Sequence, residues 1–168
     1  MTISKTTITK LHAKEPFTQL WLLFLMTAMV LVSHPANSSA ATLGEESGGG
    51  VIFYIDASRK HGLIAARSDM KGHSPGFPEG FFTWEDAQVA CKKFESCDYR
   101  DWFLPNKDQL NKLYLHRSAL EQFPLSYSYY WSSSDDGAGH AWVEGFGLGF
   151  QVLNFKTNSN RVRAVRAF

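Results

Sequence analysis

The first forty residues differ from the rest of the chain in a way that limits which part of it can fold. This segment begins with a stretch containing three lysines, continues as an apolar run at 20–32, and ends in small residues at 36–41. That order is typical of a cleavable secretory signal. The apolar run has 13 residues, whereas a membrane-spanning helix needs about 20, so a retained anchor is the less favoured alternative. We therefore expect residues 1–41 to be a signal peptide that is cleaved near Ala40 or Ala41.

Cleavage leaves residues 42–168, which is enough chain for one domain with a hydrophobic core. This part carries 14 Lys and Arg residues against 15 Asp and Glu residues, a balance of −1. Such a balance favours neither nucleic acid nor an anionic membrane surface as a partner. We expect a protein that is secreted or held at the cell surface, with the periplasm as an alternative, and that has no membrane contact after cleavage.

Both cysteines of the chain, Cys91 and Cys97, lie in the exported part. An oxidising compartment permits a disulfide between them, provided that Cys91 lies near a helix end and Cys97 in the loop that follows. We expect this bond, and two free thiols are the alternative. Two cysteines without a nearby histidine do not make a zinc site, so no structural metal is expected here.

The residue pattern of the exported part changes from strands to helices and back to strands. Residues 42–47 read as a polar linker, and runs of β-formers at 51–55 and 62–66 are joined by polar residues as a hairpin. Thr83 and Asn106 are placed to cap two helices, because apolar residues at helical spacing follow each of them. Four short strands are expected after the helices, at 129–133, 140–144, 150–155 and 162–168. Their short connections favour an antiparallel meander, so the predicted class is α+β.

The last predicted strand places a charged residue among apolar ones. Alternation puts Arg166 on the same face as Val162 and Phe168, so Arg166 points inward if Phe168 joins the core. A buried guanidinium needs a carboxylate partner. The candidate partners are Asp101 and Asp108.

Several short motifs follow one another in a recognisable order. They are GGVIFY at 49–54, GLIAA at 62–66, DWFLPNKDQLNKLY at 101–114, YWSSS at 130–134, AW at 141–142 and VRAVRAF at 162–168. In this combination the sequence resembles the C-terminal domain family of the bacterial collagen-like adhesin Lcl, over residues 48–168. The resemblance implies a compact domain of the C-type-lectin-like kind on an exported or surface protein. It also implies binding to sulfated polysaccharides, such as glycosaminoglycans, by a homotrimer.

One segment invites a catalytic interpretation. The serines at 132–134 lie close in sequence to the aspartates at 135–136 and to His140. The glycine frame of a nucleophile elbow is missing, and serines at a strand end can bond to the local backbone instead. The two aspartates with Gly137 could hold calcium weakly, but a solvated turn is the simpler interpretation. We expect no enzyme, no cofactor and no metal site.

The function most consistent with these features is adhesion to a sulfated or acidic glycan. Arg and Lys side chains bind oxyanions, and aromatic rings bind the faces of sugars. The candidate ligand-binding residues are Lys107, Lys112, Arg117, Trp142, Lys156, Arg161 and Arg163. The alternative is a structural or protein-interaction module of a surface assembly, which would require an exposed apolar patch.

Overall fold

A computed structural model describes residues 40–120 and 128–168 of the chain. Residues 1–39, which make up nearly all of the expected signal peptide, lie outside the described part, so that expectation stays a prediction. Within the described part, no helix combines the length and the apolar character needed to cross a membrane.

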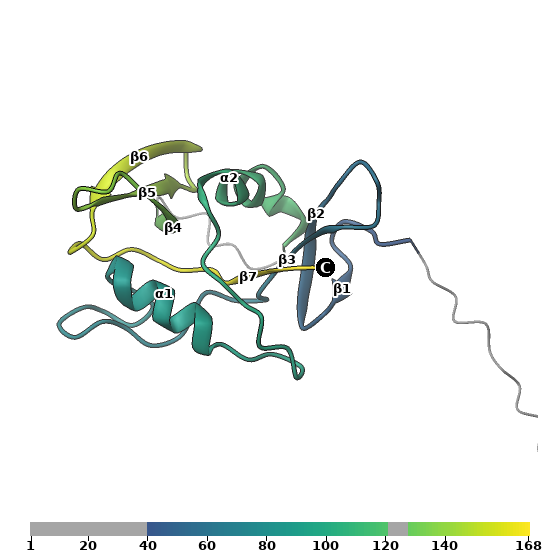
Figure 1. Ribbon diagram of the computed structural model, residues 1–168, viewed down its shortest axis with the longest axis horizontal. Helices are drawn as coiled ribbons and strands as arrows, with labels where there is room; N and C mark the ends of the chain where they lie inside the picture. The colour runs from purple at the N-terminus through teal and green to yellow at the C-terminus, as the bar shows by residue number, and fades with distance from the viewer. Residues whose placement is uncertain (1–39, 121–127) are drawn as a thin grey trace, which may run out of the picture. The chain divides into compact units, whose positions relative to one another are not determined.

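The described chain is an α+β domain with two helices and two antiparallel sheets, as the sequence pattern predicts (Figure 1). The helices are α1 (Trp84–Lys93) and α2 (Lys107–Leu115), followed by a short 3-10 helix, Arg117–Ala119. The first sheet has the order β1-β2-β3-β7, with β1 at Glu46–Ser47, β2 at Gly50–Ile55, β3 at Gly62–Ala65 and β7 at Val165–Ala167. The second sheet has the order β4-β5-β6, with β4 at Tyr129–Asp135, β5 at His140–Gly145 and β6 at Phe150–Phe155.

The expected hairpin forms β2 and β3, and the expected meander forms the second sheet. In β2 and β3, Val51 pairs with Ala65 and Ile55 pairs with Gly62. The meander is regular between β5 and β6, where His140 pairs with Phe155 and each following pair keeps this register. Short connections between neighbouring strands enforce both arrangements.

The two helices cover opposite faces of the second sheet. Side chains alternate along each strand, so Trp131 and Val143 face one side while their neighbour Tyr130 faces the other. Trp131 and Val143 pack with Cys91 of α1 in one core cluster. Tyr130 packs with Leu110 of α2 in a second cluster, which also takes in side chains of the first sheet.

Both helices begin at the residues that the sequence marks as caps. The Thr83 hydroxyl accepts a hydrogen bond from the backbone N–H of Asp86. Asn106 and Gln109 form a reciprocal capping box, with side-chain to backbone distances of 2.8 and 2.9 Å. These bonds satisfy N–H groups that the first turn of a helix leaves without a partner.

The C-terminal segment differs from the predicted strand at 162–168. Only Val165–Ala167 is strand, while the residues before it cross between the two sheets, and Figure 1 shows this segment passing between α1 and α2. The backbone carbonyl of Arg161 accepts from Trp131 of β4, and that of Ala164 accepts from Ala66, just beyond β3. Because its hydrogen bonds go to several elements in turn, the segment joins the two sheets without extending either one along its whole length.

The inward Arg166 is confirmed, and its carboxylate partner is Asp101. The Arg166 side chain is 10% exposed and forms two parallel bonds to Asp101, at 2.8 and 3.0 Å. Its guanidinium also lies 3.9 Å from the centre of the Tyr99 ring. The hydrogen bonds from Arg166 hold the pKa of Asp101 below its ordinary value. Asp108, the other candidate, lies on α2 and is not a partner of Arg166 in the described structure.

The expected disulfide between Cys91 and Cys97 is wrong in this structure, because both thiols are free. Cys91 lies on the inner face of α1 and is fully buried in the core. Cys97 is exposed in the turn that joins Ser96 to Tyr99, and its backbone is left-handed with φ of 49°. The helix directs one thiol into the core, whereas the turn directs the other into solvent.

Loss of the Asp101 carboxylate should destabilise the fold, because it leaves the buried Arg166 charge without its ion-pair partner. We expect Asp101→Ala to lower the free energy of unfolding by about 1–2 kcal/mol, measured by urea denaturation at neutral pH. Glu46→Ala is the matched control, since it removes the carboxylate of the exposed pair with Arg67. The control should change stability by less than about 0.5 kcal/mol; equal effects in the two variants would contradict this account.

The two thiols should differ in reactivity, because a thiol must ionise to react with an alkylating reagent. Burial raises the pKa of Cys91 to about 12, while Cys97 is open to solvent. We expect iodoacetamide to label one cysteine of the native protein and both cysteines of the denatured protein without added reductant. A Cys97→Ser variant should take up no label in its native state. If two thiols appear only after reduction, the cysteines are paired.

Candidate functional site

Helix α2 brings part of the predicted ligand-binding set to the surface. Leu110 and Leu113 are buried and fix the inner face of the helix against the second core cluster. The remaining positions of the helix are outward or lateral, and they include Lys107 and Lys112. Arg117 follows in the short 3-10 helix. We call Lys107, Lys112 and Arg117 the α2 cations.

Each of the α2 cations lies over an aromatic ring. The Lys107 Nζ is 3.2 Å from the centre of the Trp142 ring on β5. The Lys112 Nζ is 4.2 Å from the centre of the Tyr54 ring on β2. Arg117 lies 4.0 Å from the centre of the Tyr114 ring and donates a hydrogen bond to the Tyr114 carbonyl. A ring face attracts a cation without neutralising it, so these contacts orient the charges and preserve them.

The α2 cations also differ from most basic residues of the C-terminal segment in their lack of carboxylate partners. Among residues 40–120 and 128–168, none of the three has a carboxylate oxygen within the 4.0 Å that defines an ion pair. All three residues are half-buried. An oxyanion approaching α2 therefore meets positive charges for which no carboxylate of the described residues competes.

Trp142, the predicted sugar platform, contacts one of the α2 cations. One face of its indole ring is covered by Lys107. Its cross-strand neighbour on β6 is Leu153, which is 43% exposed. The Trp142 ring therefore lies between Lys107 of α2 and the apolar strand β6.

Two other predicted contacts are already paired with carboxylates. Lys156 donates to Asp135 at 2.5 Å and also lies over the Trp84 ring. Arg161 bonds to Asp69 at 3.3 Å and to the Ser128 hydroxyl at 3.2 Å. Both side chains remain partly exposed, but binding of an external anion would have to compete with these internal partners.

Arg163 is not available to an external ligand, contrary to the sequence-based expectation. It is 1% exposed and donates to both Asp69 and the Ala66 carbonyl, at 2.8 and 2.9 Å. Asp69 also accepts from the Tyr130 hydroxyl at 2.9 Å. Alternation along a full strand would have placed Arg163 opposite the inward Arg166, but the segment is not regular strand at this point, and both arginines are buried.

Strand β6 carries a feature that the sequence reasoning missed. Its apolar side chains do not alternate between buried and exposed positions, because every one of them is substantially exposed. The exposed fractions are 41% for Phe150, 38% for Val152, 43% for Leu153 and 59% for Phe155. Leu148, in the turn before the strand, is 68% exposed. The signal was present in the density of apolar residues at 148–155, but only the position of β6 at the edge of the sheet shows that they are uncovered.

A buried carboxylate lies beneath the start of α2. Glu144 is fully buried on β5, and its Oε2 accepts a hydrogen bond from Gln151 at 3.0 Å. The Gln151 amide also donates to the backbone carbonyl of Lys107 at 2.8 Å. The other Glu144 oxygen has no hydrogen-bond partner in the described structure. Burial raises the pKa of Glu144 to about 7, against the opposing effect of the Gln151 bond.

The segment considered for catalysis and calcium binding has a set of local contacts. The Ser132 hydroxyl is buried and contacts the backbone of Ser134. The His140 Nδ1 lies 2.9 Å from Oδ2 of Asp136, and the His140 ring packs on the ring of Phe155. Asp136 also accepts backbone bonds from its own turn, which lower its pKa. In the described ranges, no three His, Cys, Asp or Glu side chains gather as metal ligands. That the protein is not an enzyme stays a prediction.

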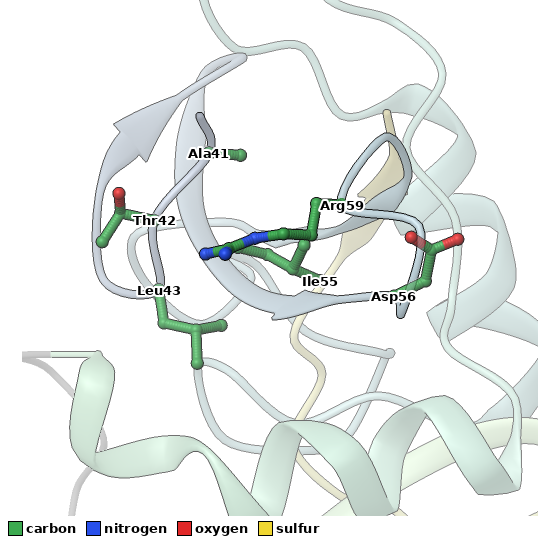
Figure 2. A pocket seen from close by; sticks show the side chains of 6 residues that line it. All are labelled: Ala41, Thr42, Leu43, Ile55, Asp56 and Arg59. Atoms are coloured by element: carbon green, nitrogen blue, oxygen red, sulfur yellow. The ribbon is translucent and has the colours of Figure 1, made fainter. Parts of the chain in front are cut away.

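Two cavities lie away from the α2 cations. The larger, of 370 Å³, is lined by Ala41, Thr42, Leu43, Ile55, Asp56 and Arg59 (Figure 2). Figure 2 shows the Arg59 side chain extending across it, over Ile55 and toward Thr42. The smaller, of 220 Å³, is lined by Gln88, Lys92, Phe103, Leu104 and Ser133. Neither includes a residue of the predicted ligand-binding set.

The raised pKa of Glu144 makes a testable contribution to stability. Between about pH 4.5 and about pH 7 the folded state binds more protons than the unfolded state, so this carboxyl lowers stability as the pH rises through that window. Glu144→Gln removes the titration. Relative to wild type, we expect this variant to gain about 2–3 kcal/mol of unfolding free energy between pH 4.5 and pH 8. Glu85→Gln, an exposed change on α1, should track wild type at every pH; parallel curves for all three proteins would refute the assignment.

Comparison with known proteins places this arrangement in a family. No curated protein matches the chain. The family model of the Lcl C-terminal domain matches residues 58–166, which include both helices, β3, the whole second sheet and most of β7; β1 and β2 precede the matched range. This agrees with the resemblance found in the sequence motifs. The chain belongs to the Lcl C-terminal domain family.

Proposed function

We propose that this domain is a non-enzymatic binding module of an exported protein, and that it adheres to sulfated or acidic polysaccharide. The observation that carries the proposal is the set of α2 cations, which lie on aromatic rings and have no carboxylate partner in the described structure. Membership of the Lcl C-terminal domain family supports a binding role, and the ligand class rests on the charges of α2.

The α2 cations are spread along and around the helix, so an extended polyanion suits them better than a small anion does. Lys107 and Lys112 are five residues apart, and Arg117 follows after five more. From Lys107 to Lys112 the helix rises about 7–8 Å and turns through about 140°, so these two cations lie on different sides of α2, and Arg117 follows beyond the helix end. A sulfated or carboxylated chain offers anionic groups at intervals, so it can engage more than one of these cations at once. A single small anion would gain only one such contact.

Rigid presentation of these charges favours binding. Lysine and arginine lose rotamer freedom when a ligand immobilises them, which weakens affinity. The rings of Trp142, Tyr54 and Tyr114 already restrict the three side chains before any ligand arrives. The neighbouring Glu144 is buried and has a raised pKa, so it contributes less negative charge near Lys107 than an exposed carboxylate would.

The proposal extends to the setting of the domain. Removal of the N-terminal segment would release the domain outside the cytosol, as a secreted or surface protein or in the periplasm. A lectin-like role agrees with an α+β domain that presents its ligand on a surface helix, and we assign the C-type-lectin-like arrangement as part of this proposal. A homotrimer, which the family resemblance implies, would multiply the binding surfaces.

A second candidate function is favoured by the exposed apolar residues of β6. Exposed apolar patches on a protein surface mark sites of protein–protein contact. In that case the domain would be a structural or interaction module of a surface assembly. The two functions are compatible, because the α2 cations and the outer edge of β6 are different surfaces.

Removal of the α2 charges should weaken binding to a sulfated polysaccharide. We expect the triple variant Lys107→Gln, Lys112→Gln and Arg117→Gln to bind heparin about tenfold more weakly than wild type, or worse, at physiological salt. The affinity should also depend less steeply on salt concentration, because about three fewer protein cations release counterions from the polysaccharide. Isothermal titration across a salt series measures both effects.

The matched control removes the same charge elsewhere. Lys71, Lys92 and Lys93 are exposed, and none of them belongs to α2. Their triple substitution by Gln should leave the heparin affinity within about twofold of wild type, because it removes as much charge from a different surface. If this control loses as much affinity as the α2 variant, binding follows net charge and the proposed site is wrong. If wild type binds no sulfated polysaccharide, the proposed function fails.

A further inference from the structure

The face of the second sheet that carries α2 is not covered by the helix along its whole length. Side chains alternate along β5, so Trp142 and Glu144 share one face. Trp142 lies under Lys107, the first residue of α2, and the Gln151 amide joins Glu144 to the Lys107 carbonyl. Both residues are therefore on the α2 side of the sheet. His140, two residues before Trp142, is on the same side.

Two exposed apolar side chains of β6 lie on the uncovered part of this face. The ladder between β5 and β6 is regular, so cross-strand partners share a face. Leu153 pairs with Trp142, and Phe155 pairs with His140. Leu153 is 43% exposed and Phe155 is 59% exposed, and neither belongs to a core cluster. We call Leu153 and Phe155 the β6 apolar pair.

Groups of opposite charge border the two ends of the β6 apolar pair. Beside one end, the Trp142 ring carries the Nζ of Lys107 at 3.2 Å from its centre. Beside the other end, the rings of His140 and Phe155 have centroids 4.5 Å apart, and the His140 Nδ1 lies 2.9 Å from the Asp136 carboxylate. The two residues of the pair are about 7 Å apart along the strand. The pair thus has a cation at one end and a carboxylate at the other.

We propose that the β6 apolar pair is a subsite for the apolar face of a sugar ring, and that this ring directs its sulfate or carboxylate toward Lys107. The subsite rests on the proposed function, because it takes one ring of the same polysaccharide. The C–H face of a sugar ring packs on aromatic and aliphatic side chains. The Lys107 ammonium, which has no carboxylate partner in the described structure, can pair with the anionic group. Asp136 repels an anion from the other end, which fixes the orientation of the ring.

The size of the β6 apolar pair fits a sugar ring better than a protein partner. At 43% and 59% exposure, two large side chains of about 200 Å² each leave about 200 Å² open. A specific protein partner covers about 800 Å² on each side. The contact with His140 also restricts the Phe155 ring before a ligand arrives, which lowers the entropic cost of binding. The ligand is therefore an acidic polysaccharide, not a polyanion that lacks sugar rings.

Heparin binding by the exported protein tests the inference. The double variant Leu153→Thr and Phe155→Thr removes the apolar pair and keeps residue types that favour strands. We expect this variant to bind heparin about tenfold more weakly than wild type at physiological salt, measured by isothermal titration. Its affinity should depend on salt as steeply as that of wild type, because no charge is removed. Phe155→Tyr keeps the aromatic face and should bind within about twofold of wild type.

The matched control changes the other face of the same strand. Val152 pairs with Val143, which packs in the core cluster of Cys91, so Val152 and Phe150 lie on the α1 side. These two side chains are 38% and 41% exposed, close to Leu153. The double variant Phe150→Thr and Val152→Thr should keep its heparin affinity within about twofold of wild type. Unchanged thermal unfolding of each variant would show that the fold is intact.

Inorganic polyphosphate separates recognition of a sugar ring from recognition of charge. It carries repeated anions and no sugar ring, so the Leu153 and Phe155 double variant should bind it as wild type does, even if the fold is somewhat less stable. The triple variant of the α2 cations should lose affinity for both polyanions.

Three outcomes would overturn the subsite. An equal loss of heparin and polyphosphate affinity in the Leu153 and Phe155 variant would show that these residues do not recognise a ring. If that variant keeps its heparin affinity while the α2 triple variant loses it, the proposed function stands without this subsite, and the β6 apolar pair is left for a protein partner. If wild type binds no sulfated polysaccharide, the proposed function and the subsite fail together.

Discussion

Asp69 receives hydrogen bonds from Arg163, Arg161 and the Tyr130 hydroxyl, and this cluster holds the C-terminal segment between the two sheets. Arg163 is almost completely buried, so its charge could not remain there without the carboxylate. The bidentate pair of Arg166 with Asp101 acts in the same way closer to the chain end. The two sheets, and the helices α1 and α2 that pack on the second sheet, are therefore held in place by Asp69 and Asp101.

The same pairing decides which basic side chains remain for function. Arginines of the C-terminal segment have internal carboxylates, because they lie where burial makes an unpaired charge too costly. Lys107, Lys112 and Arg117 lie on or just after a surface helix, where water stabilises them and aromatic rings orient them. The domain thus contains two classes of cation, one that maintains the fold and one that is available to an external anion.

The two proposed surfaces meet at Trp142. Its ring positions Lys107 on one side, and its strand β5 is paired with the open strand β6 on the other. Gln151 connects β6 to the first turn of α2 and to the buried Glu144. A protein partner that contacts β6 would consequently lie next to the cationic helix.

Local sequence determined the elements of this protein, and tertiary structure decided how their side chains are used. The caps at Thr83 and Asn106, the hairpin and the inward Arg166 follow from short-range bonding and alternation, so they were predictable. The burial of Arg163, the free thiols of Cys91 and Cys97, and the open edge of β6 were not. Each of these depends on which distant segments lie beside a residue, and the periodicity of a single strand or helix carries no information about that.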